Sequence, residues 1–136
     1  MKRIILLAFL CTTTLVMAQR INHVQEAIAN YDYEAALTLI AKEKPTIPLL
    51  LQKGKAQRGL GMNTEALSTY QEIIANDTAN TRAYIEAAEC CRSLAKYQQA
   101  LKYYEQALDL NPENKYVRIQ YIGLLLSLQK FQDALG

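Results

Sequence analysis

The sequence predicts an all-α protein built as a right-handed superhelical stack of helix–turn–helix repeats. Three observations predict this class. Residues that favour helix, above all Ala, Leu, Gln, Glu and Lys, are abundant among the 136 residues. Apolar residues recur at helical spacing, and no long run alternates in the way that a strand requires. Related residues also recur every 34 positions, which is the mark of a repeat array.

The first 18 residues have the pattern of a secretory signal peptide. Two basic residues precede the apolar stretch Ile4 to Leu10, and Ala18 offers a small residue just before Gln19. An uncleaved membrane anchor is the alternative, but three consecutive threonines interrupt the apolar stretch, and a span needs roughly 20 apolar residues. We therefore expect cleavage after Ala18 and no stable membrane span in the mature chain.

Removal of this segment changes the charge of the protein. The formal net charge of +2 includes Lys2 and Arg3, so the mature chain is neutral. A neutral chain has no overall basic field to attract nucleic acid or an anionic membrane. We predict neither as a partner.

Helical spacing and turn residues predict seven helices and the start of an eighth. They cover residues 19–30, 33–42, 47–60, 64–75, 81–94, 97–110, 115–128 and 131 onward. In the first of them, Ile21, Val24 and Ile28 fall on one face. The stretch Tyr31 to Tyr33 breaks that pattern, and Pro45 ends the second helix.

Turn and capping residues bound the later helices. Pro48 fits the first turn of the third helix, Gly61 ends it, and Asn63 or Thr64 caps the fourth. A polar loop, residues 76–80, precedes the fifth and sixth helices. Residues 111–114 form a turn before the seventh.

Four sets of equivalent residues lie 34 positions apart. They are Ala66, Ala100 and Ala134; Leu67, Leu101 and Leu135; Asn63, Tyr97 and Phe131; and Tyr70 and Tyr104. The alanines allow two helices to pack closely, and a large residue such as Tyr104 fills the gap to the neighbouring hairpin. Each hairpin then exposes apolar surface on two sides and is stable only when stacked.

These residues resemble those of a tetratricopeptide repeat (TPR) protein. The segment Thr81 to Asn114 supplies the small and aromatic positions of the family pattern. They are Tyr84, Ala88, Ala95, Tyr97, Ala100, Tyr104, Ala107 and Pro112. We assign residues 19–46 to a degenerate N-terminal hairpin, 47–80 to a TPR-like repeat, 81–114 to a TPR repeat and 115–136 to a partial repeat. Thr78 replaces the expected proline, and Arg118 replaces an expected aromatic residue.

The stretch Phe131 to Leu135 has the residues of an inward-facing helix start, but too few to cover the preceding hairpin. We therefore expect 115–136 to be a truncated repeat of a longer array. On that reading the chain could be the N-terminal adaptor of a protein with a catalytic or sensor domain beyond residue 136. The length of the continuing reading frame would decide this.

No residue pattern indicates catalysis, a cofactor or a metal. His23 is the only histidine, and we expect it to be exposed. Cys90 and Cys91 lack the spacing of redox or zinc sites, so we expect them to pack as small apolar residues, with an intermolecular disulfide as the alternative. The glycines carry no phosphate-binding signature, so we predict no enzyme.

The resemblance implies a binding site. In TPR proteins, ligands usually lie along the concave face made by the first helix of each pair. Carried over to this chain, the charged residues of that face are Lys55, Arg58, Arg82, Glu89 and Arg92, with Leu51, Ile85, Tyr116, Ile119 and Gly123 beside them. This groove is locally basic and could take an acidic peptide or a C-terminal carboxylate. A solvated charged face is the alternative reading.

We therefore expect a non-enzymatic protein-interaction scaffold that binds a peptide or a partner protein. The signal pattern and the repeats together place it in the periplasm or cell envelope of a bacterium. A self-association module is a further alternative, which a concentration-dependent mass would reveal.

Overall fold

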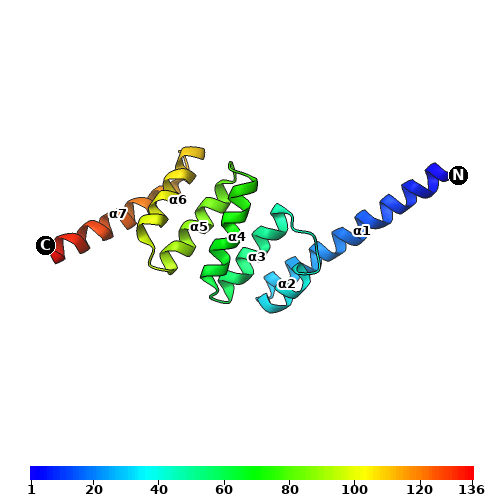
Figure 1. The fold of residues 1–136 in the computed structure, drawn as a ribbon, viewed down its shortest axis with the longest axis horizontal. Helices are drawn as coiled ribbons and strands as arrows, with labels where there is room; N and C mark the ends of the chain where they lie inside the picture. The colour runs from blue at the N-terminus through cyan, green and yellow to red at the C-terminus, as the bar shows by residue number, and fades with distance from the viewer. The chain divides into compact units, whose positions relative to one another are not determined.

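A computed structural model describes residues 1–136, which form seven helices and no strand, so the all-α prediction is confirmed (Figure 1). The helices are α1 (Lys2–Ala29), α2 (Tyr33–Ile40), α3 (Ile47–Gly59), α4 (Asn63–Asn76), α5 (Thr81–Ser93), α6 (Tyr97–Leu110) and α7 (Lys115–Leu135). They group into two compact units, Met1–Leu60 and Gly61–Gly136, and each is described by itself.

The first unit has a small core made by α1, α2 and α3. Its buried members come from all three helices and are Val24, Ile28, Ala36, Ile40, Leu49 and Ala56. The chain turns between α1 and α2 at Tyr31, which has a φ of 60°. Asp32 then caps α2 by accepting a hydrogen bond from the backbone N–H of Ala35 at 3.1 Å. This cap satisfies one of the free donors at the start of the helix.

Local packing explains two residues of α3. The Thr46 hydroxyl accepts a hydrogen bond from the Leu49 backbone N–H at 3.4 Å, and Pro48 occupies the first turn, as predicted. At the other end of α3, Gly59 lies directly against the ring of Tyr33, so a Cβ atom there would overlap the ring. The glycine therefore allows α2 and α3 to approach each other.

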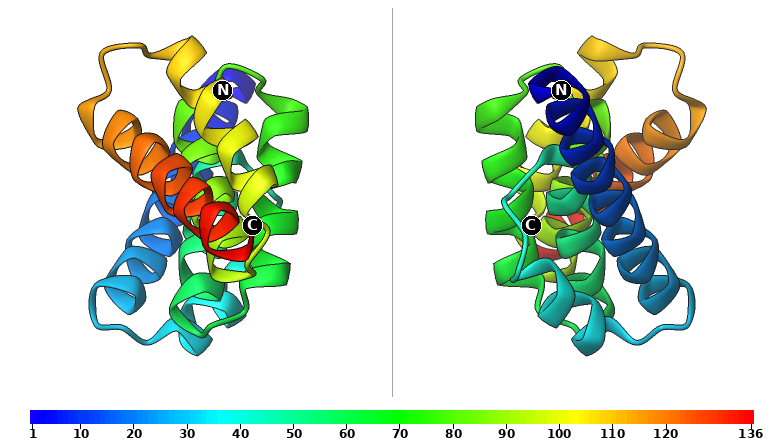
Figure 2. Two further views of the ribbon diagram at one scale, coloured as in Figure 1. Left: turned by 90° about the vertical axis from the view of Figure 1, so that its left-hand side faces the viewer. Right: turned by 90° about the vertical axis from the view of Figure 1, so that its right-hand side faces the viewer.

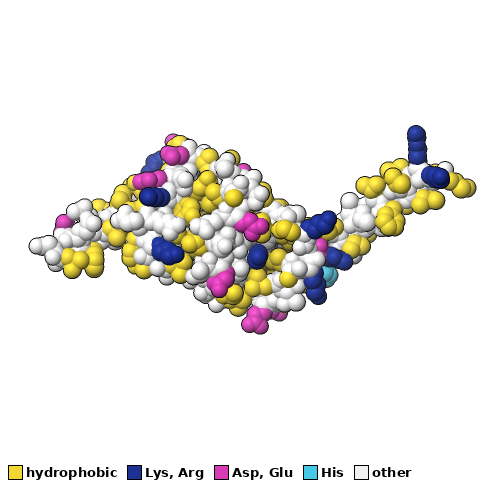
Figure 3. Space-filling model, in the orientation of Figure 1, with side chains coloured by type: hydrophobic (Ala, Val, Ile, Leu, Met, Phe, Trp, Pro, Cys, Tyr) yellow, Lys and Arg dark blue, Asp and Glu magenta, His cyan; other side chains and the backbone are white.

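Helix α1 is longer than predicted, because it runs without a break from Lys2 instead of starting at Gln19. None of its residues before Val24 is buried, and Figure 3 shows apolar side chains along this free segment. By length and composition alone, Lys2–Ala29 could cross a membrane, with a hydropathy of 1.9 in its most apolar window. A signal sequence passes the same test, so the signal peptide at residues 1–18 stays a prediction.

The second unit is packed through alanine, as the repeat pattern predicts. Six of its alanines are fully buried: Ala66, Ala83, Ala87, Ala88, Ala100 and Ala107. The large side chains of Tyr70 and Tyr104 fill the space between helices and are 1% and 0% exposed. Burying an aromatic side chain of this size stabilises the fold by about 1.5–3 kcal/mol. Cys90 and Cys91 are fully buried among these residues, as expected for cysteines that pack as small apolar side chains.

The repeat register is also visible at turns and caps. Gly61 and Ala95 precede α4 and α6 with positive φ values of 74° and 57°. Asn80 and Asn114 cap α5 and α7, each accepting a backbone N–H bond at 3.1 Å. The predicted cap of α4 is wrong. The residue before that helix is Met62, which offers no side-chain acceptor, and the chain enters the helix directly from the turn at Gly61.

The predicted end of the seventh helix at Leu128 and the eighth helix from Phe131 are wrong as well. α7 is one helix of 21 residues that continues to Leu135. The residues at the expected break, Gln129 and Lys130, are good helix formers, and neither is glycine or proline. Gln129 donates a hydrogen bond to Asp133 one turn later, at 3.0 Å, which supports the continuous helix. Figure 2 shows α7 in orange and red as a single rod.

Candidate functional site

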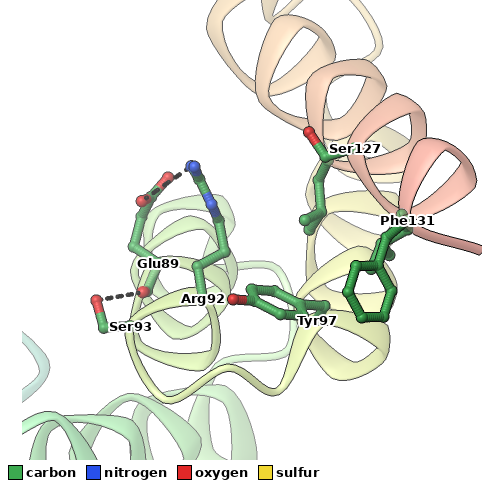
Figure 4. Close-up of a pocket in the computed structure, with 8 residues that line it drawn as sticks. Glu89, Arg92, Ser93, Tyr97, Ser127 and Phe131 are labelled. Carbon is green, nitrogen blue, oxygen red and sulfur yellow. Dashed lines mark hydrogen bonds and ion pairs between the residues drawn. The ribbon is translucent and has the colours of Figure 1, made fainter. Parts of the chain in front are cut away.

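A cavity of about 710 Å³ opens in the second unit between α5 and α7, beside the start of α6 (Figure 4). It is lined by Glu89, Arg92 and Ser93 of α5, Tyr97 of α6, and Leu124, Ser127, Leu128 and Phe131 of α7. Its volume falls in the range of about 300–1,000 Å³ that is typical of ligand pockets. Polar side chains line the part made by α5, and the part made by α6 and α7 is apolar except for Ser127.

Glu89 is the centre of the polar end. Its carboxylate accepts a hydrogen bond from the Tyr104 hydroxyl at 2.6 Å and from the Tyr116 hydroxyl at 3.1 Å. Tyr104 belongs to α6 and Tyr116 to α7, so one carboxylate joins three helices. Hydrogen bonds to a charged acceptor are about twice as strong as neutral ones.

Arg92 lies one turn further along α5 and belongs to the same network. Its Nη1 atom is 3.6 Å from a carboxylate oxygen of Glu89 and donates to Gln120 of α7 at 2.6 Å. A longer bond of 3.4 Å reaches the Tyr104 hydroxyl. Glu89 therefore balances the charge of Arg92 within the site, while the Arg92 side chain stays 39% exposed.

The network shifts the pKa values of its members. Burial, followed by the hydrogen bond to Glu89, raises the pKa of Tyr104. Burial and the charge of Glu89 raise the pKa of Tyr116 as well. The hydrogen bond to Tyr104 is the main cause that raises the pKa of Arg92. At neutral pH both tyrosines are thus neutral donors, and Arg92 carries a full positive charge.

The apolar end of the cavity is formed by Tyr97, Leu124, Leu128 and Phe131. Figure 4 shows the rings of Tyr97 and Phe131 at the same end, opposite Glu89. Tyr97 is 42% exposed and Phe131 is 63% exposed, so both offer ring surface to a ligand. Phe131 takes this position because α7 continues past Gln129 instead of turning there.

The structure brings together two of the five predicted site residues, Glu89 and Arg92. Arg82 is exposed at the start of α5 and lies ten residues from Arg92, or about 15 Å along the helix. Lys55 is exposed and Arg58 half-buried on α3, which belongs to the first unit. Of the predicted groove neighbours on α7, Tyr116 contacts Glu89, but Ile119 and Gly123 do not line the cavity.

Six residues of the cavity were missed by the sequence reasoning: Ser93, Tyr97, Leu124, Ser127, Leu128 and Phe131. The 34-residue register relates four of them to each other in pairs. Ser93 and Ser127 occupy equivalent positions, as do Tyr97 and Phe131. The register alone predicts only a packing role for the aromatic pair, because it predicts that Phe131 begins a helix that folds back.

A smaller cavity of about 360 Å³ lies in the first unit, lined by Arg20, His23, Leu39, Lys42 and Glu43. Arg20 donates to Glu43 at 2.9 Å. His23 is exposed, as predicted, and lies 3.5 Å from an exposed carboxylate oxygen of Glu26. No group of three or more metal-ligating side chains forms in the chain.

The comparison with protein families finds one match, in the C-terminal part of the chain. Residues 92–136, which include Arg92, α6 and the whole of α7, match the tetratricopeptide repeat family. Over this third of the chain, the sequence is similar to that family. Among curated proteins, none matches the sequence.

Solved TPR structures share the fold at low sequence identity. The first TPR domain of human RPAP3 is 19% identical, with 84% of this chain and 93% of that one covered and a TM-score of 0.75. The first TPR of Spaghetti (RPAP3), bound to the HSP90 peptide SRMEEVD, is 21% identical, with coverage of 82% and 92% and a TM-score of 0.77. PcrH in complex with the chaperone-binding region of PopB is 17% identical, with coverage of 80% and 94% and a TM-score of 0.70.

Proposed function

We propose that this TPR chain is a non-enzymatic scaffold that holds a segment of a partner protein in the cavity between α5 and α7. The observation that carries the proposal is the division of that cavity into an aromatic end and a charged end. Two similar folds support it, because the Spaghetti TPR was solved with an HSP90 peptide and PcrH with a region of PopB. In both, the ligand is a stretch of another protein.

The apolar end supplies most of the proposed binding energy. A Leu or Phe side chain placed between Tyr97 and Phe131 would gain about 1.5–3 kcal/mol on full burial. A carboxylate meeting Arg92 would gain only about 0–1 kcal/mol at such an exposed site, and Glu89 already competes for that guanidinium. We therefore infer a ligand segment with a large apolar side chain next to a carboxylate, in which the apolar residue decides affinity.

The remaining basic residues extend this proposal along the chain. In the second unit, Arg82 would meet a further acidic group of a longer partner. In the first unit, Lys55 and Arg58 of α3 are proposed as a basic site of their own. The charge-reversal variants Arg58→Glu and Arg92→Glu test whether these basic residues favour an acidic partner. If both variants bind a captured partner as tightly as the wild type, and with the same salt dependence, the acidic preference is wrong.

The pocket itself is tested with peptides selected by the full chain from a displayed library of random dodecapeptides. Tyr97→Ala and Phe131→Ala should each weaken binding of the selected peptides by about tenfold or more, which corresponds to about 1.4 kcal/mol. Phe131 is largely exposed, so its loss should leave the helical circular dichroism and the melting midpoint unchanged.

Leu110→Ala is the matched control, because Leu110 is 42% exposed and lies outside the cavity. It should bind the selected peptides like the wild type. Selected peptides that bind equally to the Tyr97 and Phe131 variants, or a selection that enriches no peptide, would contradict the proposed site.

We further propose that the protein acts in the bacterial cell envelope after cleavage between Ala18 and Gln19. The support is the first half of α1, which is apolar, is not buried and follows two basic residues. Expression of the full chain in a diderm bacterium, followed by N-terminal sequencing of the periplasmic fraction, should give a chain that begins at Gln19. A full-length chain retained in the membrane fraction would instead establish a permanent anchor.

A second candidate is the adaptor segment of a longer protein, with a catalytic or sensor domain beyond residue 136. The few buried residues of α7, only Val117 and Leu124, favour it, because a following hairpin would cover the rest. Genomic sequence that continues in frame past Gly136 would support this candidate, and a stop codon there would exclude it.

A further inference from the structure

Gln19 lies directly after the proposed cleavage point and is exposed on α1. Its carboxamide makes no hydrogen bond to the rest of the chain. The first buried residue of the helix is Val24, and no core residue of the first unit precedes it. Cleavage after Ala18 therefore leaves the core of this unit intact and places Gln19 at a free chain end.

A glutamine at a free chain end can react with its own backbone. The α-amine attacks the side-chain carbonyl carbon, a new N–C bond closes a five-membered lactam, and the carboxamide nitrogen takes up one amine proton and leaves as ammonia. The product is pyroglutamate, and the reaction needs no oxidant, metal or co-substrate. The ordinary pKa of an α-amine is about 7.7–8.0, so part of it is unprotonated at neutral pH.

Two conditions of this reaction are met only after cleavage. Before cleavage, the nitrogen of Gln19 belongs to a peptide bond, and its lone pair is delocalised into the carbonyl group. Afterwards, both reacting groups belong to one residue, and only the rotation of an exposed, unbonded side chain is needed. The reaction is therefore coupled to export.

The structure also shows why a charged amine is unfavourable at this position. Because α1 runs through residue 19 without a break, cleavage creates a helix start, and a positive charge there opposes the helix dipole. Arg20 is adjacent and His23 follows one turn later, and both line the smaller cavity together with Lys42. Figure 3 shows basic side chains beside the single histidine, which is the cyan group. The new amine would add a further positive charge to this corner.

We propose that Gln19 is a modification site, at which the exported chain is converted to N-terminal pyroglutamate. This inference rests on the cleavage proposed above. The lactam is neutral, so it removes the unfavourable charge from the helix start. It also leaves no free amine for an aminopeptidase, which protects residues 19–23, a terminal stretch without buried side chains.

Mass spectrometry of the chain recovered from the periplasmic fraction of a diderm bacterium tests the proposal. Digestion after glutamate releases the N-terminal peptide Gln19 to Glu26. Its mass should be lower by one ammonia than that of the unmodified sequence, in most of the protein and already at harvest. The intact chain should keep its N-terminus when it is treated with a general aminopeptidase.

Gln19→Asn is the matched control, because an asparagine at this position could cyclise only through a strained four-membered ring. This variant keeps a terminal carboxamide and should be cleaved at the same bond. Its N-terminal peptide should have the mass of the unmodified sequence. The aminopeptidase should shorten the variant under conditions in which it leaves the wild type intact.

The possible failures are distinguishable. A chain that begins at unmodified Gln19 at harvest, and cyclises only on storage, would contradict the modification and leave the proposed cleavage in place. A chain that begins at another residue, or that retains residues 1–18, would overturn both. Gln19 does not line the cavity between α5 and α7, so the peptide-binding tests are independent of this result.

Discussion

The turn between α5 and α6 and a stretch in the second half of α7 occupy the same place in the repeat, yet the chain reverses direction only at the first. Leu94–Lys96 corresponds to Leu128–Lys130 in the 34-residue register. At the first, Ala95 takes a positive φ of 57°, and the return helix α6 packs closely against α5. At the second, the helix continues through Gln129.

This difference shows what a helical hairpin requires besides the repeat pattern. A positive φ at a residue other than glycine costs about 1–2 kcal/mol, and the buried side chains of α6 offset that cost. A return segment of residues 131–135 would bury too little to do so, and continuing the helix gains backbone hydrogen bonds instead. Residues at equivalent positions therefore pack inward in one repeat and lie exposed in the other.

The sharpest test of this comparison is a pair of equivalent leucines. Leu101 is 7% exposed in α6, whereas Leu135 is 73% exposed in α7. Leu101→Ala should destabilise the protein by about 2–5 kcal/mol, because it leaves a cavity in the core. Leu135→Ala should change stability by less than about 0.5 kcal/mol. Urea unfolding followed by circular dichroism measures both, and equal losses would mean that residues 131–135 pack inward in solution.

The polar network gives a smaller effect. Tyr104→Phe removes the hydroxyl that donates to Glu89 at 2.6 Å without changing the shape of the core. We expect a loss of about 2 kcal/mol, the usual range for a bond to a charged group being about 1.5–3 kcal/mol. Tyr121→Phe is the control, because its bond to Glu105 on the exposed side of α7 should contribute less than about 1 kcal/mol. If the hydrogen bond to Glu89 contributed little to stability, both variants would lose the same small amount of free energy of unfolding.

The network also predicts how stability depends on alkaline pH. The pKa of Tyr104 is raised in the folded protein, so above pH 10 the unfolded chain releases its proton while the folded chain keeps it. This stabilisation is complete below the ordinary tyrosine pKa and is lost as the pH rises from there. Urea midpoints should therefore fall above pH 10, and less steeply for Tyr104→Phe. Cys91, Tyr116 and Tyr121 also have raised pKa values, so some slope should remain.

The smallest expected effects have opposite signs at the two turn positions. Ala95→Gly should stabilise the protein by up to about 1 kcal/mol, because glycine adopts a positive φ without strain. Gln129→Gly should destabilise α7 by up to about 1 kcal/mol, because the glycine lies in a helix interior. Thermal melts of both variants decide the matter. Stabilisation by Gln129→Gly would indicate that the chain does turn there.

Most of the fold was predictable because its signals are local. The bounds of α6 match the prediction, and those of α3 and α5 differ by one residue at one end. Helical spacing and the alanine register can be read directly from a sequence, whereas the cap predicted at Asn63 or Thr64 is wrong. The continuous α7 was not predictable from the register, because whether a turn forms depends on how much surface the returning segment can bury.

The site was predictable only in part. Glu89 and Arg92 follow from the groove positions of the TPR pattern, but their attachment to Tyr104, Tyr116 and Gln120 depends on distances between helices. Because Glu89 neutralises Arg92, the locally basic groove of the prediction is weaker than a count of charges suggests. Phe131 could enter the site only once α7 was known to be continuous.

The adjacent thiols of Cys90 and Cys91 have a consequence for measurement. Both are fully buried in α5, and burial raises the pKa of Cys91, so neither is a nucleophile in the folded state. Each can react with a thiol reagent only when α5 opens. Apart from Cys11, which is exposed within the segment expected to be cleaved, the protein has no other cysteine. The rate at which Cys90 and Cys91 are labelled therefore measures how often the repeat that contains α5 opens.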